Sequence, residues 1–191
     1  CYQPYYITSA FDVVLDKQYE WALKNDVIAY SWLAFVWAML RYDIFHTYYD
    51  RGILLPVGGY GSPNYGINIE EMQLMHLAGK RLYCLAYGAD NRTRARTLTS
   101  GDYNFCMHCT TPGRYCICDD DQAAKMLAVI DQYTTANLAS GLSIDYVPNS
   151  YEFHYLVVDT DATTPTETAG DPSKPLRILH APNHPHFKGS H

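Results

Sequence analysis

The sequence lacks an apolar run long enough to cross a membrane. Its longest one, residues 27–40, contains Ser31 and is followed by Arg41, whereas a transmembrane helix needs roughly 20 mostly apolar residues. A run of this kind predicts a buried helix instead, which we place at residues 27–42. The sequence also has no internal repeat, and its only low-complexity tract is the polar segment 160–175.

Positive charge is scarce as well. The chain has 14 Lys and Arg residues against 20 Asp and Glu, which gives a formal net charge of −6. An acidic chain does not offer the broad basic surface that binds nucleic acid, so we expect no nucleic-acid partner. The composition, with 191 residues of which 48% are hydrophobic, is that of an ordinary globular protein. Such a length holds one full domain and part of another.

The cysteines are not spread along the chain in the way that a disulfide framework requires. Of the six, Cys1 and Cys84 are isolated, and the other four lie between residues 106 and 118. This crowding is typical of a metal site in a reducing compartment, so we expect a cytoplasmic protein.

The four crowded cysteines predict a zinc site within a small insert at about residues 103–120. Cys106 and Cys109 have the short spacing that supplies two thiolate ligands from one turn, and Cys116 and Cys118 supply the second pair. His108 could replace one of them. Four thiolates close the coordination sphere, so the zinc would be structural. The alternatives are four reduced thiols without metal, or one or two disulfides.

Alternating strand and helix signals predict an α/β fold, with a Rossmann-like parallel sheet and helices on both faces. Asn68 can cap a helix that ends at Gly79, and three aspartates at 119–121 begin another. The predicted strands are residues 12–16, 43–48, 81–87, 136–139, 144–147 and 151–159, and the predicted helices are residues 27–42, 69–78 and 121–133.

Domain boundaries follow from composition. Residues 1–159 form the first domain, and the proline-containing segment 160–175 reads as a linker. We expect a new strand at residues 176–180 to begin a second domain, of which residues 176–191 would be the first part. Because the chain starts at Cys1 and stops after a Lys-Gly pair, we expect it to be a piece of a longer protein.

The stretch 82–118 carries the candidate chemistry. Asp90 follows a predicted strand and Gly88, and ligands of open α/β sheets bind beyond the carboxyl ends of the strands. Asp90 could serve as a general base or bind a substrate hydroxyl, or simply cap a turn. Arg92, Arg94 and Arg96 could bind phosphate through paired hydrogen bonds, or form a solvated surface.

His46 lies near the end of the strand at residues 43–48. It could act as a base or contact a substrate, although a packed, hydrogen-bonded histidine is the alternative. Near the C-terminus, Lys188 follows the predicted strand 176–180 where a helix should begin, a position suited to a diphosphate. A polar tail without a ligand is the other interpretation.

Several motifs together resemble one enzyme family. The resemblance rests on four segments, which in chain order are DIFHTYYDRGILLP, LYCLAYGADNRTR, NFCMHC…GRYCICDD and HAPNHPHFKGS. It is to glycosyltransferases of the two-Rossmann-domain (GT-B) type, in the large retaining group that uses nucleotide sugars. The resemblance covers most of residues 43–190. It implies two facing α/β domains, the first binding the acceptor and the second the nucleotide-diphospho-sugar donor.

The resemblance also implies roles for particular residues. Lys188, Gly189 and Asn183 would lie beside the donor diphosphate, and Arg92 would face the cleft, where Arg92 and Arg94 are the anion-binding candidates already named. Asp90 and His46 would face the acceptor, a saccharide or another hydroxyl compound, and peripheral contact with a membrane is compatible with this role. The glutamate-bearing donor motif of the family is absent, so the chain alone should be inactive.

Two other classes of function stay open from the sequence. One is a zinc-stabilised binding module without catalysis, whose arginines hold an anionic partner. The other is a different nucleotide-binding enzyme such as an epimerase, although the Gly-x-Gly-x-x-Gly turn that it would need is missing.

Overall fold

The chain divides into two compact units, Cys1–Phe153 and His154–His191. The computed structural model describes residues 15, 19–55, 67–88, 90–113, 116–147, 149–153, 161 and 175. The fold below is therefore that of the first unit. The predicted linker 160–175 and strand 176–180 lie outside the described residues, apart from 161 and 175. The predicted strand 12–16 also lies outside them, except for Leu15, which is helical.

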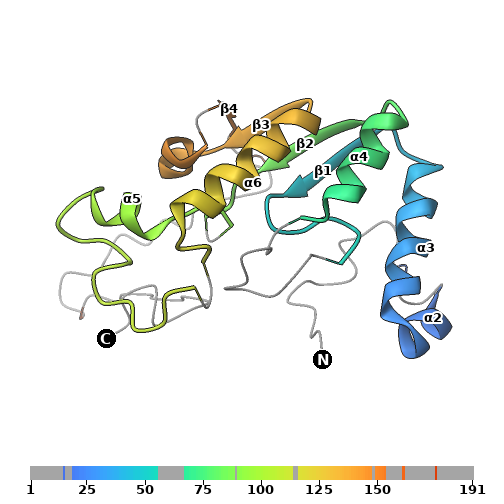
Figure 1. Ribbon diagram of the computed structural model, residues 1–191, viewed down its shortest axis with the longest axis horizontal. Helices are drawn as coiled ribbons and strands as arrows, with labels where there is room; N and C mark the ends of the chain where they lie inside the picture. The colour runs from blue at the N-terminus through green and yellow to red at the C-terminus, as the bar shows by residue number, and fades with distance from the viewer. Residues whose placement is uncertain are drawn as a thin grey trace. The chain divides into compact units, whose positions relative to one another are not determined.

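A parallel four-stranded sheet organises the first unit. Its strands are β1 (Ile44–Tyr48), β2 (Arg81–Leu85), β3 (Ala136–Ala139) and β4 (Ser150–Glu152). They pair in chain order, β1-β2-β3-β4, and every pair is parallel (Figure 1). The α/β fold with a parallel sheet is thus confirmed.

Two helices connect consecutive strands. α4 (Ile69–Leu77) lies between β1 and β2, and α6 (Asp120–Tyr133) lies between β2 and β3. Side-chain caps begin both helices: Asn68 accepts a hydrogen bond from the Glu70 N–H, and Asp119 accepts one from the Gln122 N–H. The predicted Asn68 cap is therefore confirmed, and the predicted acidic start of the second helix includes a cap at Asp119.

Figure 1 shows α4 and α6 side by side over the same face of the sheet. Consecutive strand order explains this, because right-handed crossovers that all step in one direction place their helices on one face. Helices were predicted on both faces of the sheet, and among the described elements the two connecting helices cover one face.

Strand burial follows the same asymmetry. Phe45 and Thr47 of β1 pair with Leu82 and Cys84 of β2, and all four are buried. The intervening β1 residues Ile44, His46 and Tyr48 are exposed. The buried row packs against Met72 and Met75 of α4 and Ile130 of α6, which form the main core.

A helical hairpin precedes the sheet: α2 (Glu20–Asn25) and α3 (Val27–Met39). The side chain of Asp26 caps α3 by accepting hydrogen bonds from the N–H groups of Ile28 and Ala29. Only one side of α3 joins the core, mainly through Phe35 and Ala38. The helix prediction is confirmed, but complete burial is wrong, because Ile28, Val36 and other apolar side chains of α3 are exposed.

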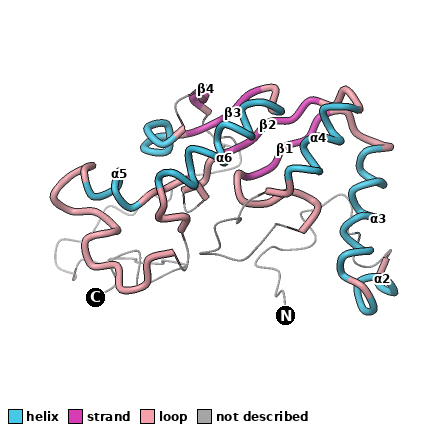
Figure 2. Tube along the Cα trace, viewed as in Figure 1, coloured by secondary structure: helices cyan, strands magenta, loops and turns pink. Residues whose placement is uncertain are grey.

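Two further segments differ from prediction. Residues 144–147 do not form a strand. Residues 144–146 are the last residues of a 3₁₀ helix, η2 (Gly141–Tyr146), and Val147 follows it. Gly141, the first residue of η2, has a left-handed φ of 53°. The arginine-rich segment forms a short helix, α5 (Arg94–Leu98). Figure 2 shows that loop fills most of the path from α5 to α6, where the cysteines lie. In the described part of the chain, no helix has the length and apolar character that a bilayer span requires.

Candidate functional site

Asp90 holds together the loops that leave β1 and β2. Its side chain is fully buried. One carboxylate oxygen accepts hydrogen bonds from the backbone N–H of Gly88 at 2.8 Å and of Tyr87 at 3.1 Å. The other accepts one from the Tyr49 N–H at 3.4 Å. Asp90 therefore satisfies backbone donors at the carboxyl ends of two adjacent strands, a role close to the turn-capping alternative.

Burial raises the pKa of Asp90 from 3.8 to about 7. The negative charge of Asp50 acts in the same direction, while the three backbone N–H donors oppose the shift by stabilising the carboxylate. A pKa near neutrality suits a proton acceptor. However, the side chain has no exposed surface, so a substrate hydroxyl cannot reach it in this conformation. Its catalytic role stays a prediction.

Asp50 is a second buried carboxylate at this edge of the sheet. The Tyr87 hydroxyl donates a hydrogen bond of 2.8 Å to it, and Arg51 forms an ion pair with it at 3.3 Å. Asp50 follows β1 as Asp90 follows β2. Sequence reasoning missed it, although the same rule about carboxyl ends of parallel strands would have found it.

The residues after Asp90 lead from this buried pair to a cavity. Asn91 is buried, and within the described part of the chain neither its amide nitrogen nor its amide oxygen has a hydrogen-bond partner. The Arg92 N–H donates to the Gly88 carbonyl at 2.9 Å. Gly88 itself has φ of 131°, and a Cβ there would lie 3.3 Å from the Arg92 guanidinium carbon. Glycine is thus needed both for the backbone and for the arginine.

α5 is fixed by hydroxyl contacts at both of its ends. The Thr93 hydroxyl donates to Asp120 at 2.5 Å, which connects the start of α5 to the start of α6. The hydroxyls of Thr97 and Tyr146 lie 2.7 Å apart, so α5 is also joined to η2. These contacts set the wall of the cavity.

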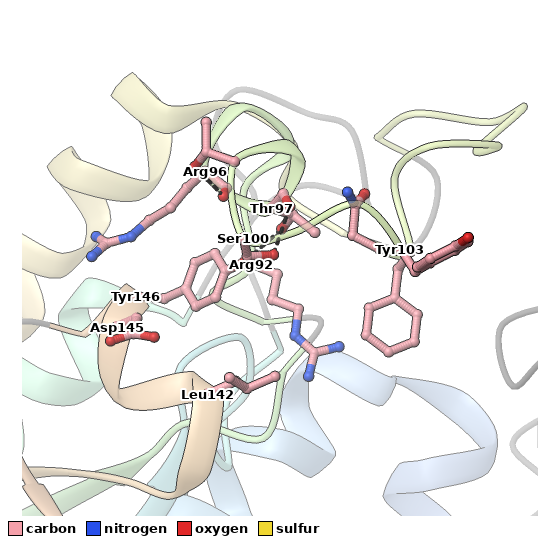
Figure 3. Close-up of a pocket in the computed structure, with 11 residues that line it drawn as sticks. Arg92, Arg96, Thr97, Ser100, Tyr103, Leu142, Asp145 and Tyr146 are labelled. Carbon is pink, nitrogen blue, oxygen red and sulfur yellow. Dashed lines mark hydrogen bonds between the residues drawn. The ribbon is translucent and has the colours of Figure 1, made fainter.

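The cavity has a volume of about 290 Å³ and opens between the loop after β2 and the 3₁₀ helix after β3 (Figure 3). It therefore lies beyond the carboxyl ends of two adjacent strands, where open α/β sheets bind ligands. The lining combines two arginines, aromatic rings, hydroxyls and one acid: Arg92, Arg96, Thr97, Thr99, Ser100, Tyr103, Asn104, Phe105, Leu142, Asp145 and Tyr146.

The three predicted arginines separate in the structure. Arg92 and Arg96 both line the cavity, with their guanidinium groups over the rings of Phe105 and Tyr146 at 4.9 and 5.5 Å. Arg94 does not line it; its charge acts instead on the thiol of Cys106. Arg92 lies before Thr93, the first residue flanking α5, whereas Arg94 and Arg96 lie two residues apart within the helix and therefore point to different sides of it.

His46 lies away from this group. It occupies the middle of β1 on the exposed face and makes an edge-to-face ring contact with Phe153 at 6.4 Å. Partial burial disfavours the charged imidazolium and so lowers the pKa of His46. The described residues do not bring His46 to the cavity lining, and its catalytic role stays a prediction.

The four crowded cysteines are half-buried free thiols. Burial raises the pKa of Cys106 and raises that of Cys116 to about 11, and neighbouring cysteines add to both shifts. The Gly113 N–H donates to the Cys118 sulfur at 3.2 Å, and Cys118 has a left-handed φ of 60°. Cys106, Cys109, Cys116 and Cys118 thus lie close enough for their charges to interact.

A metal ion requires several ligating side chains that are placed together around it, and the side chains near the cysteines are the candidates. Among the described residues, no group of three or more His, Cys, Asp and Glu side chains is placed to hold one. The donor set nevertheless has the chemistry of a zinc site, because thiolates in two short-spaced pairs suit a tetrahedron. Asn104 orders the start of this segment by accepting hydrogen bonds from the N–H groups of Cys106 and Met107.

Asn183, Lys188 and Gly189 lie outside the described residues, so their predicted contact with a donor diphosphate stays a prediction. Comparison with other proteins adds no assignment: no family model, curated protein or solved structure matches this chain.

Proposed function

We propose that the chain is the acceptor-side part of a glycosyltransferase of the two-Rossmann-domain type, which uses a nucleotide-diphospho-sugar donor. The observation that carries the proposal is the cavity lined by Arg92 and Arg96 at the carboxyl ends of β2 and β3. The parallel sheet with connecting helices supports an α/β domain, and the described strands, which pair in chain order, do not include the reversal of strand order that marks a Rossmann fold. The motif resemblance supplies the reaction type, which the fold alone cannot.

Under this proposal the chain's own residues do two things. The cavity holds the acceptor beside the sheet, and Asp90 keeps the loops after β1 and β2 in place through its backbone hydrogen bonds. Lys188 would stabilise the diphosphate as it leaves, because a fixed cation interacts more strongly with the charge that develops in the transition state.

The test is donor turnover by the full-length protein with a panel of UDP-, GDP- and ADP-sugars. We expect hydrolysis or transfer with at least one donor, and Lys188→Ala should lower both kcat and donor affinity. Lys80→Ala is the matched control, since Lys80 pairs with Asp43 beside the start of β2, at the opposite end of the sheet from the cavity. No turnover and no nucleotide binding with any donor would end the proposal.

We also propose that Cys106, Cys109, Cys116 and Cys118 bind one structural zinc ion. The support is the spacing of the two cysteine pairs in the sequence and the N–H donor to the Cys118 sulfur. A zinc ion there would fix the loop between α5 and α6 and would require reduced thiols, as in the cytoplasm.

Metal analysis of the purified protein tests this site. We expect about one zinc per chain and loss of the zinc in Cys118→Ser. Cys84→Ala is the control, because Cys84 is buried beside Thr47 in the sheet and should not affect zinc content. Metal-free protein of unchanged thermal stability, or zinc retained in Cys118→Ser, would contradict the proposal.

The second candidate function is a non-catalytic, zinc-stabilised module that binds an anionic partner. The cavity arginines favour it as much as they favour the transferase. The donor panel separates the two, since anion binding without turnover would leave the module as the better account.

A further inference from the structure

Arg92 is the cationic group that faces the cavity most directly. Figure 3 shows its side chain extending into the space beside Tyr146 and Leu142, whereas the Arg96 side chain runs past the Tyr146 ring. Arg92 is half-buried, and its guanidinium carbon lies 4.9 Å from the centre of the Phe105 ring. Its direction is thus fixed by a ring on one side and by Gly88 on the other.

No carboxylate in the described part of the chain forms an ion pair with Arg92. A guanidinium that has lost part of its water and has no counter-ion is costly to hold in place. An anionic ligand would offset this cost, and the planar fork of arginine suits phosphate oxygens in particular. Because the Arg92 guanidinium has no ion-pair partner among the described residues, its charge points to an anion in the cavity.

The rest of the lining suits hydroxyl groups. Asp145 offers carboxylate oxygens that accept hydrogen bonds, and the hydroxyl of Ser100 can do so as well. Asp145 would repel the anion itself, so the anion belongs on the Arg92 side and the hydroxyls on the Asp145 side. A flat wall from Tyr146 and Leu142 can pack against a sugar ring.

The volume limits the ligand. About 290 Å³ is at the small end of ligand cavities, for which roughly 300 Å³ is the usual lower bound. A monosaccharide or polyol with one phosphate matches this size, and a whole nucleotide sugar exceeds it.

We propose that the cavity binds a small phosphorylated sugar or polyol, with its phosphate on Arg92 and its hydroxyls on the side of Asp145. The assignment of this ligand as the acceptor rests on the proposed transferase function, but its binding does not. A soluble sugar phosphate and a phosphorylated lipid headgroup share this chemistry.

Calorimetric titration without any donor tests the proposal. Glucose 6-phosphate should bind the full-length protein with an affinity at least about tenfold higher than glucose, since one charged hydrogen-bonded pair is lost with the neutral sugar. Vesicles of phosphatidylcholine with and without phosphatidylinositol form the second arm. Binding only to the vesicles that contain phosphatidylinositol would identify a headgroup as the source of the phosphate.

Two variants locate the binding in the cavity. Arg92→Ala should weaken binding of the phosphorylated probe at least about tenfold and leave the weak binding of glucose unchanged. Leu142→Asp adds a negative charge at the cavity and should also weaken it, with Leu77→Asp as the control. Both leucines are exposed, at 68% and 81%, so neither change should unfold the protein even if Arg92→Ala does.

The proposal is overturned if neither phosphorylated probe binds, if glucose binds as tightly as glucose 6-phosphate, or if Leu142→Asp and Leu77→Asp bind the phosphorylated probe equally well. Phosphate binding without sugar transfer would instead refute the transferase and leave this site intact. Sugar transfer to neutral acceptors only would support the transferase and refute the phosphate site.

Discussion

The buried carboxyl group of Asp90 should make the stability of this protein fall as the pH rises from 5 to 7.5. In the folded protein its pKa is about 7, against an ordinary value of 3.8. The folded state therefore holds the proton more tightly than the unfolded chain does. The contribution to the free energy of unfolding is fully present below about pH 4 and is lost as the pH rises toward 7.

The magnitude follows from the two pKa values. Between pH 5 and 7.5 the unfolded chain is already deprotonated at this position, while most of the folded molecules lose the proton. Each unit of pKa difference corresponds to about 1.4 kcal/mol, so the loss across this range is on the order of 2 kcal/mol. In Asp90→Asn no proton is exchanged at this site, and this part of the pH dependence should disappear.

The assay is urea unfolding of the wild type and Asp90→Asn at both pH values. The difference in unfolding free energy, wild type minus variant, should decrease by on the order of 2 kcal/mol at the higher pH. Glu71 is buried with a raised pKa too, but it is common to both proteins and cancels. Asp43→Asn is the control, because Lys80 lowers the pKa of that exposed carboxylate and it stays charged throughout.

A difference that stays constant with pH would show that Asp90 titrates near its ordinary value, and the account of its burial would then be wrong. A pKa lowered below 3.8 by the backbone N–H groups of Gly88, Tyr87 and Tyr49 would give the same constant difference, because the carboxylate would then be charged in both states from pH 5 upward.

Two more changes test the packing around the site. Asn91→Leu should be neutral or stabilising in urea unfolding, because the buried amide has no partner to lose among the described residues. Destabilisation by more than about 2 kcal/mol would mean that the amide is hydrogen-bonded in solution. Gly52→Ala should cost about 2 kcal/mol or more, because the new Cβ would lie 2.4 Å from a carboxylate oxygen of the buried Glu71. Gly79→Ala, whose Cβ would meet nothing within 4 Å, should cost about 1 kcal/mol from its backbone strain alone, and equal losses at the two glycines would refute the collision.

Local chemistry made the sheet and its connecting helices predictable. Asn68 and Asp119 cap their helices with their own side chains, and Gly79 ends α4 with φ of 67°. These signals act within a few residues, so the sequence displays them directly. The apolar strands near residues 44 and 81 are equally local features.

The cavity could not be predicted in the same way, because it depends on contacts between distant residues. The segment 144–147 is apolar and short, which does not separate a strand from a buried turn of helix. Its true conformation is set partly by the contact between Tyr146 and Thr97 of α5. Likewise, Arg92, Arg94 and Arg96 alternate along the chain, and only the fold shows that Arg92, which precedes α5, and Arg96, which lies in α5, line the same cavity.

The chain order of the four strands has a consequence for how the sheet is assembled. Each strand pairs with the one synthesised just before it, so the sheet can grow one neighbour at a time as the polypeptide emerges, without waiting for a distant segment. The slow step should be the addition of β3, because the long loop that contains the cysteines separates it from β2 and the entropy of closing that loop must be overcome first. Ligation of the cysteines would shorten the free part of this loop and so accelerate the step.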